Sequence, residues 1–214
     1  RDLHPRVRRQ RQMCIRDSLI GMGCKCLVIA CNTATTAAVR ALRARYEGVP
    51  VIGIEPALKP AVLHKPHGRV LVLATAVTLH EEKFHRLMAR YENDADIFTL
   101  ACPGIVEFVE RGIIEGEELI EYLKQLLRNY IDNPPDAVVL GCTHYPFVRK
   151  AIDSVLGGHA EIFDGGNGTA RETGHQLKLH DLCASPDSLG NVTILNSKPE
   201  MIPISEWLLK LPIE

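Results

Sequence analysis

Apolar and polar residues follow two different patterns along the chain. Short apolar runs at 25–30, 69–73 and 137–140 predict strands that are covered on both faces, because their side chains are apolar in both directions. Longer stretches with helical spacing follow, as at 33–46 and 78–90. Strands that alternate with helices in this way form βαβ units, so we predict an α/β fold with mostly parallel sheets.

The same alternation continues to residue 179. Further strands are predicted at 51–54, 97–100, 161–163 and 192–195, and further helices at 56–64, 105–111, 117–130, 147–156 and 169–179. A helix is also expected to end at 19–22, before a glycine. Three prolines lie in the tail 195–214, which we predict to be irregular, with Trp207 packed on the first domain or on a second subunit.

Composition excludes several functional classes. The chain has 214 residues, 46% of them hydrophobic, and its formal net charge of −1 gives no general basis for binding nucleic acid or a membrane. No apolar run approaches the ~20 residues of a transmembrane helix. Seven cysteines without the spacing of a disulfide framework indicate a reducing, cytoplasmic location.

Residues 1–18 differ from the rest of the chain. They hold six arginines and a net charge of +4, whereas the remainder carries −5. Hydrophobic periodicity is nearly absent from this stretch. We expect a non-native or disordered basic arm here, with an RNA-binding arm as the alternative.

Two of the cysteines are candidates for chemistry. Cys31 and Cys142 each end an apolar predicted strand, follow a small residue and precede residues that can cap a helix. The carboxyl ends of parallel strands form the edge of the sheet where ligands bind. A helix N-terminus lowers the pKa of a thiol toward neutrality, so we expect each cysteine to exchange protons near pH 7.

His144 lies close enough in sequence to exchange a proton with Cys142, and a structural, half-buried ring is the alternative for it. The pattern Cys142-Thr-His144 does not have the spacing of a zinc site, and neither does the pair Cys24 and Cys26. Small buried hydrophobic side chains are expected for Cys24, Cys26, Cys102 and Cys183.

Several segments, in order, resemble the glutamate racemases of the aspartate/glutamate racemase superfamily. The matching segments are VIACNTATT around Cys31, GVPVIGIEPALKPAV at 48–62, VLVLAT at 70–75, ACP at 101–103, GCTHYP at 141–146 and DGGNGTARET at 164–173. The His-Tyr-Pro sequence after Gly-Cys-Thr is similar to the glutamate enzymes rather than to the aspartate enzymes. The resemblance implies two α/β domains related by a pseudo-twofold axis, with the active site in the cleft between them. We expect an incomplete first domain at 19–52 plus 164–214 and a second at 53–163.

The resemblance also implies the residues of the site. Cys31 and Cys142 match the two catalytic cysteines, and His144 assists Cys142. The matched substrate-binding residues are Asn32, Thr33, Thr75, Thr78, Glu110, Thr143 and His144. For Glu110 the alternative is an ordinary exposed helix carboxylate. By the family's pattern, Cys142 acts on L-glutamate and Cys31 on D-glutamate, one thiolate removing the Cα proton while the opposite thiol returns one.

No cofactor and no metal are implied. The sequence contains no glycine-rich dinucleotide motif and no lysine in a recognisable Schiff-base setting. The resemblance implies glutamate as the small-molecule substrate, a homodimer, and a role in supplying D-glutamate for peptidoglycan. No membrane or nucleic-acid partner is expected, and contact with DNA gyrase is implied by family analogy alone.

Two family motifs are absent from the sequence: an Asp-Ser-Gly-x-Gly-Gly segment that ends an early strand, and a Pro-Tyr-Gly loop. The first would set the proton state of the first cysteine, and the second would hold the substrate carboxylate. Two alternatives to glutamate racemisation therefore stay open. One is an aspartate or broad-specificity amino-acid racemase, and the other is a catalytically inactive fragment that acts only as an interaction module.

Overall fold

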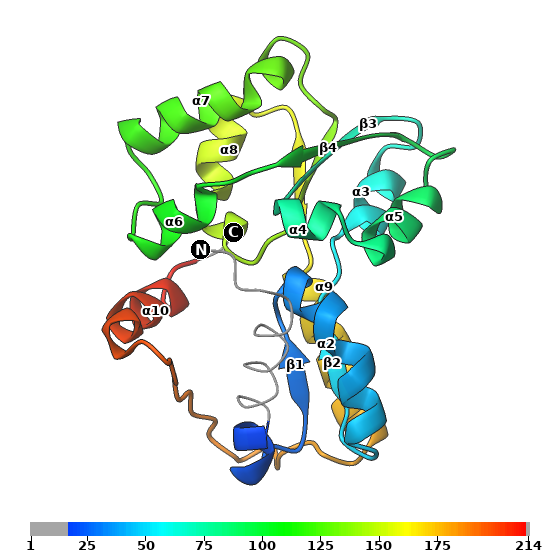
Figure 1. Ribbon diagram of the computed structural model, residues 1–214, viewed down its shortest axis with the longest axis vertical. Helices are drawn as coiled ribbons and strands as arrows, with labels where there is room; N and C mark the ends of the chain where they lie inside the picture. Colours follow the sequence, from blue (N-terminus) through cyan, green and yellow to red (C-terminus); the bar gives the residue numbers. More distant parts are fainter. Residues whose placement is uncertain (1–16, 213–214) are drawn as a thin grey trace.

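The computed structural model describes residues 17–212, which form two parallel sheets (Figure 1). The first sheet pairs β1 (Leu27–Ile29) with β2 (Val51–Gly53). The second has the order β4-β3-β5-β6. Its strands are β3 (Arg69–Ala74), β4 (Asp96–Ala101), β5 (Ala137–Leu140) and β6 (Glu161–Asp164). All pairings are parallel, which confirms the predicted α/β class.

The four-stranded sheet is the centre of a large lobe, by which we mean β3–β6 with helices α3 to α8. Strand β5 is buried along its whole length, because alternate side chains enter two separate cores. Val138 and Leu140 face the core under α6 (Ile105–Glu110), α7 (Glu117–Ile131) and α8 (Arg149–Val155). Ala137 and Val139 face the core under α3 (Leu58–His64) and α5 (Glu82–Ala89). Each buried leucine or valine contributes roughly 1.5–3 kcal/mol, so this lobe holds most of the stabilising apolar area.

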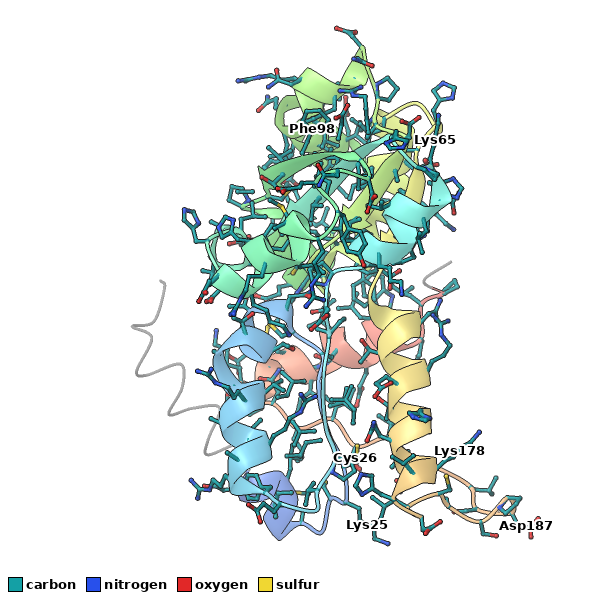
Figure 2. The ribbon with its side chains drawn as sticks, turned by 90° about the vertical axis from the view of Figure 1, so that its right-hand side faces the viewer. Lys25, Cys26, Lys65, Phe98, Lys178 and Asp187 are labelled. Atoms are coloured by element: carbon teal, nitrogen blue, oxygen red, sulfur yellow. The ribbon has the colours of Figure 1, made fainter. Side chains whose placement is uncertain are left out.

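The two-stranded sheet is the centre of a small lobe, made of β1, β2, α2 (Asn32–Arg45) and α9 (Gly166–Leu179). Figure 2 shows α2 and α9 on opposite sides of the strands. The core under α2 consists of Leu27, Ala38, Val39, Leu42 and Val51. Helix α9 buries no residue. The small lobe is therefore held by far less buried apolar surface than the large one.

Two chain crossings that connect the lobes touch one another at a glycine. A Cβ built on Gly165, after β6, would lie 2.5 Å from the carbonyl oxygen of Glu55, after β2. Next to it, Arg149 Nη2 donates to Asp164 Oδ2 at 2.5 Å, and the amide of Gly166 donates to Asp164 Oδ1 at 2.8 Å. Only glycine fits this contact, so the crossings form one tight hinge.

Most predicted helices and strands are confirmed, and three differ. The predicted helix 78–90 is two helices, α4 (Ala76–Leu79) and α5, because Thr75 caps α4 and Glu81 is extended before α5. The predicted helix 147–156 starts as the 3-10 turn η1 (Tyr145–Val148) before α8. The predicted strand 192–195 is wrong, since this segment pairs with no described strand and Val192 is 71% exposed.

The tail is more regular than its prolines indicated. The turn η2 (Pro199–Met201) leads into α10 (Ile202–Leu209), with Pro203 tolerated in the first turn of the helix. Leu208 packs against the core of the large lobe. Within 17–212, no helix is both long and apolar enough to span a bilayer. The predicted arm 1–18 lies almost wholly outside the described residues, and residues 17–21 are helical.

Candidate active site

Two strand ends bring the candidate cysteines toward one another. Cys31 follows β1 and is the N-cap residue of α2. Cys142 follows β5 and Gly141, whose amide donates to the carbonyl oxygen of Leu73 at 2.7 Å. A Cβ on Gly141 would lie 2.9 Å from both Ala74 Cβ and Leu73 O. The absence of a side chain at Gly141 therefore lets the Cys142 loop lie against the end of β3, beside Thr75.

The two thiols have different surroundings. Cys31 is exposed, whereas Cys142 is half-buried. Burial raises the pKa of the Cys142 thiol to about 11; amide hydrogen bonds from His144 and Thr143 oppose this rise, and the neighbouring Cys31 adds to it. The predicted depression of the thiol pKa is thus wrong for Cys142, because loss of solvent outweighs the nearby amides. The contact of Thr33 with Thr75 and the close approach of Gly141 to Ala74 bring the loops that carry the two cysteines to the same end of β3.

His144 lies next to Cys142, and the carboxylate of Glu110 lies next to His144. His144 Nδ1 lies 3.8 Å from Cys142 Sγ, and His144 Nε2 lies 3.6 Å from Glu110 Oε1. Glu110 is the last residue of α6 and its side chain is 53% exposed, so the alternative of an exposed helix carboxylate stays open beside this contact. A carboxylate behind an imidazole fixes the ring's orientation and stabilises it when it takes a proton. The three side chains can therefore move a proton on and off Cys142.

Three threonine hydroxyls join the two lobes. Thr33 Oγ1, from α2, lies 3.3 Å from Thr75 Oγ1 and 3.1 Å from Thr78 Oγ1. The last two lie 3.0 Å apart, and Thr75 Oγ1 also accepts from the amide of Thr78 at 3.2 Å. Each hydroxyl has one proton to donate and two lone pairs. The cluster can therefore reorient to bind the carboxylate or the ammonium group of an amino acid.

The start of α2 supplies further polar groups. The first hydrogen bond of the helix runs from the amide of Thr35 to the carbonyl oxygen of Cys31 at 2.8 Å. No side chain caps this end, so the amides that precede Thr35 are available to an anion. Asn32 is buried, and its Oδ1 has no hydrogen-bond partner among the described residues. An unpaired buried acceptor costs about 1–3 kcal/mol, which a bound donor would recover.

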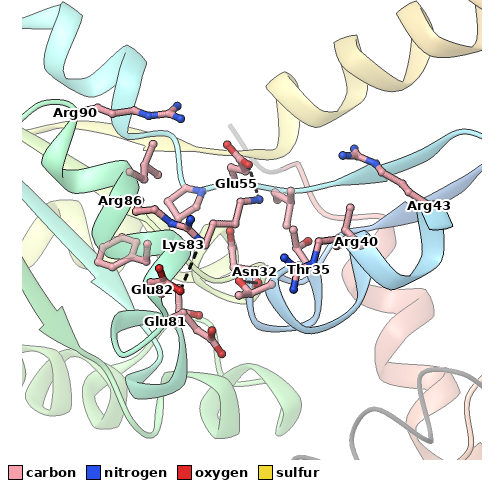
Figure 3. Close-up of a pocket in the computed structure, with 17 residues that line it drawn as sticks. Asn32, Thr35, Arg40, Arg43, Glu55, Glu81, Glu82, Lys83, Arg86 and Arg90 are labelled. Carbon is pink, nitrogen blue, oxygen red and sulfur yellow. Dashed lines mark hydrogen bonds and ion pairs between the residues drawn. The ribbon is translucent and has the colours of Figure 1, made fainter.

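A pocket of about 630 Å³ adjoins this group of residues (Figure 3). Asn32 and Thr78 are in its wall, and the rest of the lining comes from α2, α5 and the hinge. Lys83 and Glu55 form an ion pair across it at 2.5 Å. Neither Cys31 nor Cys142 lines this pocket.

The structure also shows what the sequence missed. Tyr145 is fully buried and donates its hydroxyl to the carbonyl oxygen of Cys102 at 3.0 Å, which anchors the loop after Cys142 to the end of β4. Its place within the Gly-Cys-Thr-His-Tyr-Pro motif was the available signal. Of the cysteines expected to be buried, Cys102 is buried and Cys24 and Cys26 are half-buried. The expectation is wrong for Cys183, which is exposed in the segment after α9. In 17–212 no three metal-binding side chains come together.

The fold and the paired cysteine loops define a class of proteins. Residues 12–173 match the family model of the Asp/Glu/Hydantoin racemases, and the chain belongs to this family. Among its relatives, the glutamate racemase of Clostridium botulinum is 43% identical over 196 residues, which are 91% of this chain and 76% of that protein. The glutamate racemase of Clostridium acetobutylicum is 45% identical over 197 residues, with 91% and 77% covered.

Solved structures give the same result. Escherichia coli glutamate racemase, in complex with L-glutamate and the activator UDP-MurNAc-Ala, aligns with a TM-score of 0.81 at 29% identity, over 96% of this chain and 79% of that one. Thermus thermophilus glutamate racemase, in complex with β-chloro-D-alanine, aligns with a TM-score of 0.75 at 28% identity, over 96% and 77%. The α/β class with parallel sheets agrees with both.

Proposed function

We propose that this protein interconverts L- and D-glutamate without a cofactor, with Cys31 and Cys142 exchanging protons with Cα of the substrate from opposite faces. The observation that carries the proposal is that two cysteine loops from different lobes meet at the end of β3, where Thr33 Oγ1 lies 3.3 Å from Thr75 Oγ1 and Gly141 lies against Ala74. The relatives named glutamate racemase support glutamate as the substrate. The family resemblance supports the supply of D-glutamate for peptidoglycan as the physiological role.

The raised pKa of Cys142 sets a requirement on the first step. With a pKa of about 11, forming the thiolate at pH 7 costs about 5 kcal/mol. His144 lies beside the sulfur and can accept its proton, and Glu110 stabilises the resulting imidazolium. A thiolate formed in this way is a strong base, as the weakly acidic Cα–H bond of an amino acid requires.

The proton transfers then balance. The Cys142 thiolate takes the Cα proton of L-glutamate and becomes a thiol, which leaves an electron pair on Cα. The Cys31 thiol delivers its proton to the opposite face of Cα and becomes a thiolate, and D-glutamate is formed. In this proposal the first amides of α2 and the hydroxyls of Thr33, Thr75 and Thr78 hold the α-carboxylate and stabilise the negative charge that spreads onto it; the uncapped start of α2 and the contacts among the hydroxyls support these roles.

The test is a chiral assay of the purified chain. Incubation with L-glutamate in D₂O is expected to yield D-glutamate that carries deuterium at Cα. Cys31→Ser and Cys142→Ser are each expected to abolish turnover, whereas Cys183→Ser, a change at an exposed cysteine, is expected to leave it intact. L-aspartate serves as the competing substrate. Turnover by the double variant at the parental rate would refute the two-thiol mechanism, and faster racemisation of aspartate would refute glutamate as the substrate.

A further inference from the structure

Helix α10 is held at the end of a long exposed segment. The chain between α9 and η2 contains no helix or strand, and Leu195 within it is 64% exposed. Figure 1 shows this segment running from the far end of the small lobe to α10, which lies below α6. Residues 181–198 can span about 60 Å when fully extended. Because the tether permits many positions, the contacts of α10 itself must decide where it lies.

Those contacts are few and lie on one side of the helix. Ile204 Cδ1 lies 3.1 Å from the position that a Cβ on Gly112 would take. Leu208, one turn further, packs against the core of the large lobe. Elsewhere on the helix, Trp207 is 39% exposed and Leu209 is 60% exposed. Ile204 and Leu208 are thus the residues by which α10 docks.

Gly112 belongs to the cap that ends α6. The amide of Gly112 donates to the carbonyl oxygen of Val109, and the amide of Ile113 donates to that of Phe108, each at 2.9 Å. With the φ of Gly112 at +77°, these two bonds form a Schellman motif, which fixes where the helix stops. The last helical residue before this cap is Glu110.

We infer that Ile204 is a positioning residue for Glu110. By packing on the Gly112 cap, Ile204 holds the last turn of α6 so that the Glu110 carboxylate stays against His144. This inference rests on the proposed function, since it assigns to the tail a part in activating Cys142. Ile204 lies far from Glu110 in sequence and contacts Gly112, so it acts on Glu110 through the cap.

The test uses the full chain with Ile204→Ala, the conservative variant Ile204→Val, and Leu209→Ala as the matched control on the exposed side of the same helix. Hydrogen exchange measured by mass spectrometry is expected to rise in residues 105–116 for Ile204→Ala alone. In the racemase assay, Ile204→Ala is expected to lower kcat about fivefold with KM unchanged, while Ile204→Val restores it.

A double-mutant cycle separates positioning from general loosening of the fold. If Ile204 acts through Glu110, the effect of Ile204→Ala on kcat disappears in a Glu110→Gln background. An effect that persists in that background, or unchanged exchange in 105–116, would overturn the inference. If the parental chain shows no racemisation, the proposed function fails instead, and the exchange measurement still decides whether Ile204 holds the end of α6.

Discussion

Gly141→Ala would add one methyl group where β5 turns into the Cys142 loop. The new Cβ would lie 2.9 Å from Ala74 Cβ and from the carbonyl oxygen of Leu73. The carbonyl oxygen is also the acceptor for the Gly141 amide at 2.7 Å, so it cannot move away without loss of that bond. We expect the loop to shift, at a cost of about 1–3 kcal/mol in the free energy of unfolding.

The same shift would move Cys142 relative to Cys31. Misplacement of a reacting group by about 1 Å can cost about 100-fold in rate, so kcat is expected to fall by that order while the fold persists. Urea unfolding followed by circular dichroism gives the stability, and the chiral assay gives kcat. The control is Gly174→Ala in α9, where the added methyl meets no atom within 4 Å and the helix gains up to about 1 kcal/mol. Unchanged stability and unchanged kcat in Gly141→Ala would refute the close-approach argument.

Three further outcomes are expected. Thr33→Val removes the hydroxyl contacts between the lobes and should lower the free energy of unfolding by about 1 kcal/mol and raise KM. The control is Thr36→Val, because the Thr36 hydroxyl donates to the carbonyl oxygen of Asn32 within the same helix. Equal KM values for the two variants would contradict the assignment. The rate at which iodoacetamide alkylates Cys142 should keep rising with pH beyond 9, because the pKa of this thiol is raised to about 11. A rate that levels off near pH 8, measured by mass-spectrometric mapping, would contradict the raised pKa. Hydrogen bonds from Lys65 and from the amide of Arg69 hold the pKa of Asp136 below its unfolded value. This carboxylate therefore stabilises the fold at pH values above the unfolded pKa, and the stabilisation is lost as pH falls through the folded pKa. In Asp136→Asn, the urea midpoint should accordingly depend less on pH between pH 5 and pH 2.

The strands and helices of the large lobe could be predicted because the apolar pattern of each element depends on which of its faces are buried. Val138 and Leu140 alternate with Ala137 and Val139, and both sets are apolar because both faces of β5 are covered. The helix 78–90 was predicted as one element because its apolar spacing continues through the break. The break depends on a side-chain cap at Thr75 and an extended residue at Glu81, which periodicity does not report.

The errors in the tail have a different origin. Residues 192–195 alternate like a strand, but a strand also needs a neighbour with free backbone groups, and none of the described strands pairs with it. Helix α10 differs from the predicted irregular tail because Pro203 stands in the first turn of the helix, where proline is tolerated and does not break it. Its docking on Gly112 depends on three-dimensional contact alone. Sequence spacing could not have indicated it.

The site residues also divide into those that the local sequence could predict and those that depend on the folded structure. That Cys31 and Cys142 each follow a strand and precede a helix was visible in the sequence, and so was the proximity of His144 to Cys142. The reach of Glu110 to His144 depends on how α6 packs within the large lobe, whereas the meeting of Thr33 with Thr75 and Thr78 depends on how the two lobes dock. Only the family resemblance indicated these residues. The direction of the Cys142 pKa was predicted wrongly because burial is a property of the whole fold. A helix N-terminus is a local property, and here it is the weaker effect.

The surroundings of the two thiols are unequal, although a racemase makes the same demand on each thiol at the two ends of its reaction. L- and D-glutamate have equal free energy, so both thiols must serve as base and as acid with comparable ease once substrate is bound. Cys142 is half-buried already and has His144 beside it, whereas Cys31 is exposed. A substrate lying between the lobes would cover Cys31, so that both thiols would then be shielded from water. The asymmetry of the free protein is therefore compatible with symmetric chemistry, provided that the small lobe can close on the hinge at Gly165 and Glu55.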